Sequence, residues 1–447
     1  LSFYFIARAI IQFPGFFAVF RLFFRALQRL DYEQLLVLLL SLAPLAFQTV
    51  AILLLRRWGG ARTGVGEALG SVFGLGLGLY LTEGLVFLVG LLLYRRLGFA
   101  LWPLFRPTFD RRIAGRMLSF GLRMALGSLV VPVAYFVQAA LLSGFLPDYG
   151  EVGGAWSIAL SLFPVYEVLA IGLYNGLMPA VAAAFTQGYR TLTRYYASQG
   201  LRYGMWFSLF FLATAGALGD RFVLGLLGER YAGAAEMVGP LLIWGALQWL
   251  PWSAEAVLVG VGRPALRSAL LVSEYLVRFG LLLIVRLEYG IWGLVAAFAL
   301  ASLLRGLLGW LLVQRLVVNV RLPFWQMAVA PAGAALVVYN LLRGVGDIYW
   351  QPDVGVTLIF SILVLLPALP LYGFFTAFLG GWDDEGLAEL RRAVAISGLG
   401  IPLGRLLYEA VHLGARLSPL HGLFSHQLYR WADEEAEALT LRRPVIR

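Results

Sequence analysis

Five arginines stand inside long apolar segments, where a charged side chain needs a partner or a polar cavity. Arg21 lies near the inner end of its segment, where its stem can carry the charge to the membrane surface, and the other four are candidate site residues. A guanidinium is planar and stays charged in any environment, and its N–H donors can bind a carboxylate or a phosphate through two parallel hydrogen bonds. The four candidates for binding an anion are therefore Arg8, Arg123, Arg278 and Arg305. Arg123 is close to the end of its segment, so its long stem can also carry the charge to the membrane surface.

Three acidic residues in the apolar segments are candidates for binding a proton or a coupling cation, and they are Glu83, Glu167 and Glu274. Glu167 lies near the middle of its segment, just after Pro164, where a helix is disturbed. A hydrogen-bonded structural acid is the alternative interpretation there. Glu274 and Arg278 are four residues apart, so on a helix they can pair with each other. A self-contained structural pair explains them as well as a substrate site does.

Residues typical of an enzyme or a metal site are few. The acids Asp383, Asp384 and Glu385 directly precede LAELRRAV, where carboxylates normally cap a helix and interact with its dipole. The three histidines, His412, His421 and His426, have no regular ligand spacing, and the chain has no cysteine. We therefore expect no catalytic residue, no metal and no cofactor.

The composition is that of an integral membrane protein. Hydrophobic residues make up 60% of the chain and charged residues 13%, and the mean hydropathy is +0.81. Soluble domains carry about 25% charged residues. The net charge of +10 does not indicate nucleic-acid binding, because most arginines lie in loops between apolar runs, as at a cytoplasmic membrane face.

Eleven apolar runs approach or exceed the ~20 residues that cross a bilayer as a helix. They predict an all-α bundle of about eleven transmembrane helices at residues 1–24, 33–55, 66–94, 117–145, 153–186, 204–219, 237–261, 268–285, 291–314, 324–342 and 354–379.

The loop arginines indicate an orientation. If the loop after the first run is cytoplasmic, inner loops carry fifteen arginines and outer loops seven. Cytoplasmic loops are enriched in basic residues, so this bias places the C-terminus inside the cell.

Two similar stretches then start inward-running helices from the outer face: DYGEVGGAWSIALSLF from Asp148 and EYGIWGLVAAFALAS from Glu288. In each, an acid and a tyrosine suit the membrane interface, the first glycine suits a turn with positive φ, and the second suits close helix packing.

Together with LMPAVAAAF, LLGERYAGAAEMVGPLLIWGALQW and VGVGRP, these stretches resemble the multidrug/oligosaccharidyl-lipid/polysaccharide exporter superfamily. Within it, the chain resembles the polysaccharide and lipid-linked oligosaccharide flippases. The resemblance covers residues 120–320, and more weakly residues 20–97.

The resemblance implies two six-helix lobes that face each other across a central cavity, with an additional helix pair in the polysaccharide branches. Residues 1–97 would be a partial first lobe, residues 117–316 the second lobe and residues 324–379 the additional pair. Residues 380–447 would be a cytoplasmic tail, part of which can lie amphipathically on the inner leaflet. Because only three runs precede the second lobe, we expect about three further helices upstream of Leu1.

The implied function is translocation of a lipid-linked oligosaccharide or polysaccharide precursor across the cytoplasmic membrane by alternating access. The partners would be a polyprenyl- or dolichyl-(pyro)phosphate-linked glycan, the bilayer and polysaccharide-assembly proteins. The intramembrane arginines would bind the phosphate. Two alternatives are a proton- or cation-coupled multidrug exporter of the same superfamily and a membrane-bound glycan-assembly enzyme.

Overall fold

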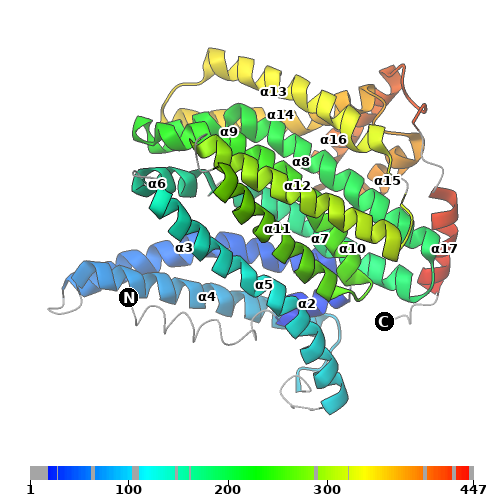
Figure 1. Cartoon of the computed structure of the whole chain (residues 1–447), viewed down its shortest axis with the longest axis horizontal. Coiled ribbons are helices and arrows are strands. Elements are labelled where there is room, and N and C mark those ends of the chain that lie inside the picture. The colour runs from blue at the N-terminus through cyan, green and yellow to red at the C-terminus, as the bar shows by residue number, and fades with distance from the viewer. Residues whose placement is uncertain are drawn as a thin grey trace. The chain divides into compact units, whose positions relative to one another are not determined.

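Helices make up almost all of the chain that the computed structural model describes, and that part contains no strand (Figure 1). The all-helical fold expected from the sequence is therefore confirmed. The described residues are 19–27, 29–61, 66–102, 110–145, 149–160, 163–285, 290–320, 322–395, 400–424 and 429–441.

The α-helices are α2 (Val19–Ala26), α3 (Leu30–Gly60), α4 (Gly66–Arg96), α5 (Arg111–Phe145), α6 (Tyr149–Leu160), α7 (Phe163–Thr186), α8 (Arg190–Leu227), α9 (Ala232–Leu247), α10 (Trp249–Gly260), α11 (Pro264–Val285), α12 (Gly290–Leu316), α13 (Ala330–Tyr349), α14 (Val354–Phe378), α15 (Asp384–Ala395), α16 (Ile401–Leu417) and α17 (Tyr429–Leu441). A short 3₁₀ turn, η2 (Glu229–Tyr231), precedes α9, and a π-helical turn, η3 (Trp325–Val329), leads into α13.

Most predicted apolar runs coincide with single helices, and the short run at 204–219 lies inside the much longer α8. The run at 153–186, predicted as one helix, covers both α6 and α7. Most of the run at 1–24 lies outside the described residues. The run at 237–261 is divided between α9 and α10, which meet at Gln248. Pro251 explains this division, because it has no N–H to donate to the carbonyl of Leu247.

Six helices in the described part of the chain are long and apolar enough to cross a membrane, which makes the chain a multi-pass membrane protein by helix length and composition. They are Asp31–Gly60, Gly66–Arg96, Arg190–Leu227, Trp292–Leu316, Trp325–Tyr349 and Val354–Phe378. The larger number of spans expected from the sequence stays a prediction.

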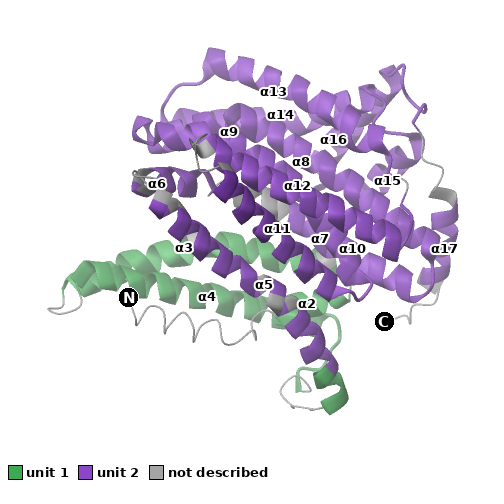
Figure 2. Cartoon of the chain, viewed as in Figure 1, with its two compact units in different colours: residues 1–115 green, residues 116–447 purple. Residues whose placement is uncertain are grey.

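The chain divides into two compact units, residues 1–115 and 116–447 (Figure 2). Unit 1 is organised around the long contact between α3 and α4. Every fourth residue of α4 along that contact is small or buried, and Gly70, Gly74 and Gly78 face the backbone of α3. A Cβ atom on Gly74 would lie 2.5 Å from the carbonyl oxygen of Ala51. The missing side chains therefore allow the two helices to touch through their backbones.

A buried ion pair joins α2 to α3 in unit 1. The guanidinium of Arg25 donates to the carboxylate of Glu33 at 2.5 and 2.9 Å, and Glu33 is fully buried. A buried carboxylate is stable only when it is paired and hydrogen-bonded, so this pair fixes α2 against the start of α3.

Unit 2 is built around α8, which packs against α7, α9, α10, α13 and α14. The fully buried Trp249 of α10 lies against Gly204 of α8, where any Cβ atom would overlap its indole ring. The indole N–H donates to the carbonyl oxygen of Gly200 at 3.0 Å. This contact brings α10 close to α8.

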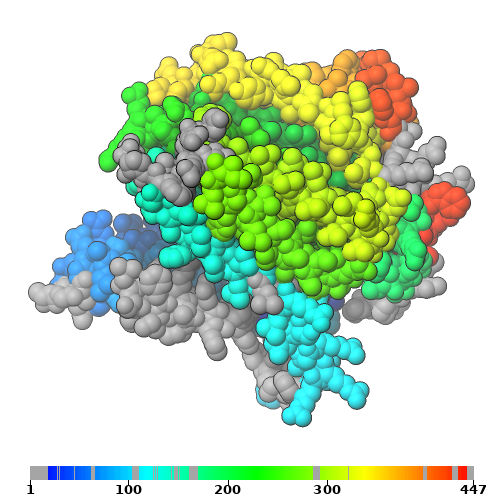
Figure 3. Space-filling view, in the orientation of Figure 1, coloured from blue at the N-terminus to red at the C-terminus, as the bar shows by residue number. Residues whose placement is uncertain are grey.

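The outer surface of unit 2 is apolar where α12 and α13 form it, and Figure 3 shows both helices on the visible face. Large hydrophobic side chains are exposed along α12, and they include Trp292, Leu300, Leu304, Leu307 and Leu311. Such a continuous apolar face is typical of a helix that contacts lipid.

Both repeated stretches begin a helix, as expected: α6 starts at Tyr149 and α12 at Gly290. The positive φ expected for the first glycine of the first copy is wrong, because Gly150 lies inside α6. The close helix packing expected for the second glycine, Gly153, stays a prediction.

The C-terminal region folds onto unit 2. Asp383 caps α15 by accepting from the N–H of Gly386 at 2.9 Å, which confirms the capping role expected for this acidic cluster. Its other oxygen accepts from Gln326 of η3 at 3.1 Å. Further along, Glu435 of α17 accepts from the N–H of Leu192 at 2.6 Å, in the first turn of α8.

We predict that Gly74→Ala destabilises unit 1 while Gly76→Ala does not. The new methyl group at Gly74 would overlap the backbone of Ala51, which typically costs about 1–3 kcal/mol. Gly76 is on the same helix, and a Cβ atom there would meet nothing within 4 Å. Thermal unfolding of the two variants in detergent measures the difference, and equal stabilities would contradict the close packing of α3 and α4.

A second prediction concerns the pH dependence of stability at Glu389 on α15. Burial raises the pKa of this carboxyl to about 7, with a further increase from Asp433 of α17 and an opposing decrease from Arg392. Tyr203 of α8 donates to it at 2.9 Å. Because the folded pKa is above the unfolded value of 4.5, the protonated form stabilises the fold. That stabilisation is complete below the unfolded pKa and is lost as the pH rises through about 7.

Glu389→Gln should therefore reduce the fall in the free energy of unfolding between pH 4.5 and 7. Denaturant unfolding at several pH values measures the slope. Glu409→Gln, which changes an exposed carboxylate on α16, is the matched control and should leave the slope unchanged. A slope unaffected by Glu389→Gln would show that Glu389 is not perturbed by the packing of α15.

Candidate functional site

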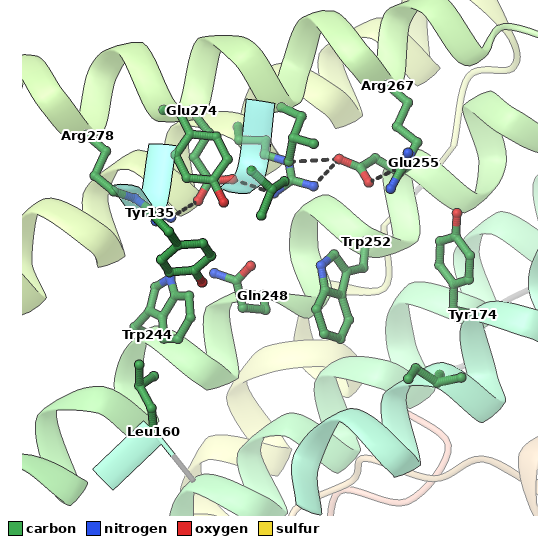
Figure 4. A pocket seen from close by; sticks show the side chains of 15 residues that line it. Tyr135, Leu160, Tyr174, Trp244, Gln248, Trp252, Glu255, Arg267, Glu274 and Arg278 are labelled. Carbon is green, nitrogen blue, oxygen red and sulfur yellow. Dashed lines mark hydrogen bonds and ion pairs between the residues drawn. The ribbon is translucent and has the colours of Figure 1, made fainter. Parts of the chain in front are cut away.

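A cavity of about 600 Å³ lies within unit 2, lined by residues of α5, α6, α7 and α9 to α12 (Figure 4). It contains all five charged side chains of one buried cluster, and these are Glu255, Arg267, Glu274, Arg278 and Arg305. Aromatic side chains line much of the rest of its wall, beside Gln248 and several aliphatic residues, and they are Tyr135, Tyr174, Trp244, Trp252 and Tyr275. The cavity is thus polar on one side and aromatic on the other.

The charged side chains form one continuous chain of ion pairs, from Arg278 through Glu274, Arg305 and Glu255 to Arg267, which the dashed lines of Figure 4 follow. Arg278 donates to Glu274 at 2.5 Å, one helical turn away on α11. Arg305 of α12 donates to both carboxylates, with its Nε 2.7 Å from an oxygen of Glu255. We call this set the ion-pair chain.

Neutral donors hold the centre of the ion-pair chain in place. The hydroxyl of Ser302 donates to Glu274 at 2.8 Å, from one turn before Arg305 on α12. Ser302 in turn accepts from the indole of Trp244 at 3.0 Å and from the amide of Gln248 at 2.7 Å. The junction between α9 and α10 thus supplies the groups that orient a carboxylate of α11.

The ion-pair chain has more positive than negative charge, because three guanidinium groups alternate with two carboxylates. Glu255, Glu274, Arg278 and Arg305 are all at most 5% exposed. The two ends of the ion-pair chain are arginines whose hydrogen-bonding capacity is not fully used. Nε and Nη1 of Arg278 and Nη1 of Arg267 have no hydrogen-bond partner among the described residues. The residues that line the cavity therefore carry a net positive charge and retain buried N–H donors without a partner in the described part of the chain.

Aromatic rings partly compensate the charge of Arg278. Its guanidinium carbon is 3.8 Å from the ring centroid of Phe298 and 4.7 Å from that of Tyr275. A cation above a ring face is stabilised by about 0.5–2 kcal/mol, which is much less than an ion pair deep in an apolar medium. An anionic ligand would stabilise this end of the ion-pair chain more strongly than the rings do.

Three of the site residues predicted from the sequence meet in the ion-pair chain: Glu274, Arg278 and Arg305. Arg123 does not: its side chain is exposed on α5, and its carbonyl accepts from Ser268 at 2.6 Å. Glu83 is half-buried on α4, in unit 1. Arg8 and the side chain of Glu167 lie outside the described residues.

Glu255 and Arg267 were not predicted as site residues. Glu255 stands in an apolar run, but its partners Arg267 and Arg305 are twelve and fifty residues away in the sequence, so no helical spacing reveals them. Arg267 precedes the apolar run at 268–285 and so was among the fifteen arginines expected in inner loops, but the structure places it in the first turn of α11. The signal available for Glu255 was its charge inside an apolar segment.

Another hollow in unit 2, of about 520 Å³, lies among α8, α9, α12 and α13. Its lining residues are apolar apart from Tyr339, and none of them is charged. It therefore offers no group for a charged ligand, which leaves the first cavity as the candidate site. In the described part of the chain, no three histidine or acidic side chains meet in a way that could hold a metal ion.

Comparisons with known proteins give structural similarity without a sequence match. No protein-family model matches the chain, and no curated protein matches it. One similar solved structure is an outward-facing multidrug resistance MATE family transporter of the MOP superfamily, at 16% sequence identity and a TM-score of 0.40; the similarity covers 73% of this chain and 84% of that one. Another is a MATE structure in a bent conformation, at 18% identity and a TM-score of 0.39, covering 73% and 83%.

We predict that Glu255→Gln destabilises unit 2 strongly. The substitution leaves Arg267 without its carboxylate and Arg305 with Glu274 alone, and breaking a buried pair costs about 3–5 kcal/mol. Glu229→Gln, at an exposed position of η2, is the matched control. Thermal unfolding in detergent compares the two. A Glu255→Gln variant as stable as the control would mean that the ion-pair chain contributes little to the fold.

Proposed function

We propose that the chain is an exporter of the multidrug/oligosaccharidyl-lipid/polysaccharide superfamily that moves a lipid-linked oligosaccharide or polysaccharide precursor across the cytoplasmic membrane by alternating access. The observation that carries this proposal is the buried cavity with a surplus of arginine and an aromatic wall, inside a helical membrane protein. The resemblance of the repeated YG stretches to the flippase branch supports the same conclusion.

The phosphate or pyrophosphate of such a substrate suits the ends of the ion-pair chain. Arg278 and Arg267 have N–H donors that no described group accepts from. Phosphate oxygens accept such bonds in pairs from a planar guanidinium, and they would neutralise the surplus charge. The tyrosine and tryptophan side chains of the wall combine an apolar face with a polar tip, which suits the mixed surface of a sugar. The long apolar chain of the lipid carrier can remain in the bilayer.

Glu274 can link an ion gradient to substrate binding in this scheme. One of its oxygens accepts from Arg278 and the other from Arg305. Protonation of Glu274 would weaken both ion pairs and release two guanidinium groups toward a phosphate. Glu83 and Glu167 remain proposed coupling groups from the sequence, and Arg8 and Arg123 remain proposed phosphate ligands.

A multidrug exporter of the same superfamily is the second candidate, because the aromatic wall also suits a planar organic cation. The charge of the cavity favours the anionic substrate, since both carboxylates are already paired with arginines. In either case we place the chain in the cytoplasmic membrane with its C-terminus inside, on the basis of the loop arginines. Polysaccharide-assembly proteins would be its partners in the first case.

Ligand binding separates the two candidates. We expect the detergent-solubilised protein to bind a polyprenyl-pyrophosphate disaccharide more tightly than tetraphenylphosphonium, a lipophilic cation. Arg267→Gln and Arg278→Gln should each weaken binding of the disaccharide by about tenfold or more, because a hydrogen bond from a charged group contributes about 1.5–3 kcal/mol. Arg278→Lys should have an intermediate effect, since it keeps the charge and loses the planar fork.

Arg263→Gln is the control for Arg267→Gln, because Arg263 is exposed four residues earlier in the sequence. Its affinity for the disaccharide should equal that of the unmodified protein. Tighter binding of the cation, or unchanged affinity in both cavity variants, would contradict the proposed substrate.

A further inference from the structure

The C-terminal helix α16 has three distinct faces, and only one of them packs against the rest of unit 2. That face lies on the end of α14, next to α16 in Figure 1. A Cβ atom on Gly414 would lie 2.3 Å from the carbonyl oxygen of Phe374, and Ser418 donates to the carbonyl of Phe378 at 2.6 Å. The helix is thus held against a segment that is itself long and apolar enough to cross a membrane.

The second face is apolar and exposed. Its residues recur at alternating spacings of three and four, which place them on one stripe of an α-helix. Leu403, Leu406, Leu413 and Leu417 are 46, 48, 51 and 58% exposed, and Ala410 lies between them in the same stripe. No side chain in the described part of the chain covers this leucine stripe.

The third face is polar and carries the charges. Arg405, Glu409, His412 and Arg416 form a stripe that also alternates spacings of three and four, on the face next to the leucines, and its two arginines and Glu409 are exposed. The neighbouring α15 adds the exposed Arg391 and Arg392 at its end and the exposed acids Asp384 and Glu385 at its start. The exposed charges of the two helices are therefore four arginines and three acids.

We propose that α16 is an interfacial anchor whose leucine stripe enters the bilayer beside α14 and whose arginines contact anionic lipid headgroups. A helix with a packed face, an apolar face and a basic face fits the boundary between acyl chains and headgroups. The packing on α14 places α16 next to lipid, and the basic residues complement the negative charge of phosphatidylglycerol or a similar lipid. The anchor fixes the C-terminal region to the membrane independently of the transported substrate.

The absence of cysteine allows a direct test by site-directed spin labelling. Single cysteines replace Leu406 and Leu413 in the leucine stripe and Glu409 in the polar stripe, and each variant is labelled with a nitroxide in nanodiscs. We expect labels at positions 406 and 413 to collide more often with oxygen, which is concentrated in lipid, than with a water-soluble nickel chelate. The label at position 409 should show the reverse preference. Collision with nickel at all three positions, or burial of the leucine positions from both reagents by a protein partner, would overturn the proposal.

The lipid preference needs a second comparison, between nanodiscs of phosphatidylcholine alone and nanodiscs that also contain phosphatidylglycerol. The label at position 413 should lie deeper in the anionic nanodiscs. The double substitution Arg405→Gln and Arg416→Gln should abolish that increase, whereas Lys replacements at the same two positions should preserve it. An equal depth in both nanodiscs would overturn the role of the arginines.

Discussion

A charged side chain is stable inside an apolar helical bundle only if other charged groups compensate it, and unit 2 meets this requirement with one alternating chain of arginines and glutamates. Each carboxylate lies between two guanidinium groups, so neither acid is buried alone. The same arrangement leaves one positive charge in excess, at ends that retain unused N–H donors. Structural compensation and ligand recognition thus depend on the same residues.

The architecture of unit 2 follows from bringing α10, α11 and α12 together around these charges. The chain divides α9 from α10 at Gln248, so α10 starts beside the cavity. Trp244 and Gln248 donate to the hydroxyl of Ser302, which in turn donates to Glu274. Close packing at Gly204 and Trp249 holds α10 on α8. Unit 1 also depends on glycines for close packing, because the glycines of α4 allow its backbone to contact α3. In both units, glycines determine which helices pack closely, as the buried ion pairs do.

The local features of this structure could be predicted from the sequence. Apolar runs gave the helices, and the spacing of Glu274 and Arg278 gave their pairing, since four residues make one turn. The place of Glu255 in the ion-pair chain could not be predicted, because its partner Arg305 is fifty residues away and only tertiary packing joins them. The turn expected at Gly150 was wrong: a glycine after an acid and a tyrosine suits a turn locally, but α6 already starts at Tyr149.

The most direct test of this account is an electron cryomicroscopy structure of the protein bound to a polyprenyl-pyrophosphate-linked glycan. The account predicts density for the pyrophosphate inside the cavity of unit 2, within hydrogen-bonding distance of Arg278 or Arg267, with the sugars against the aromatic wall. An occupied structure in which the pyrophosphate binds elsewhere and the ion-pair chain is unchanged would contradict it. Density for a cation between Glu255 and Glu274, with the arginines displaced, would contradict it equally.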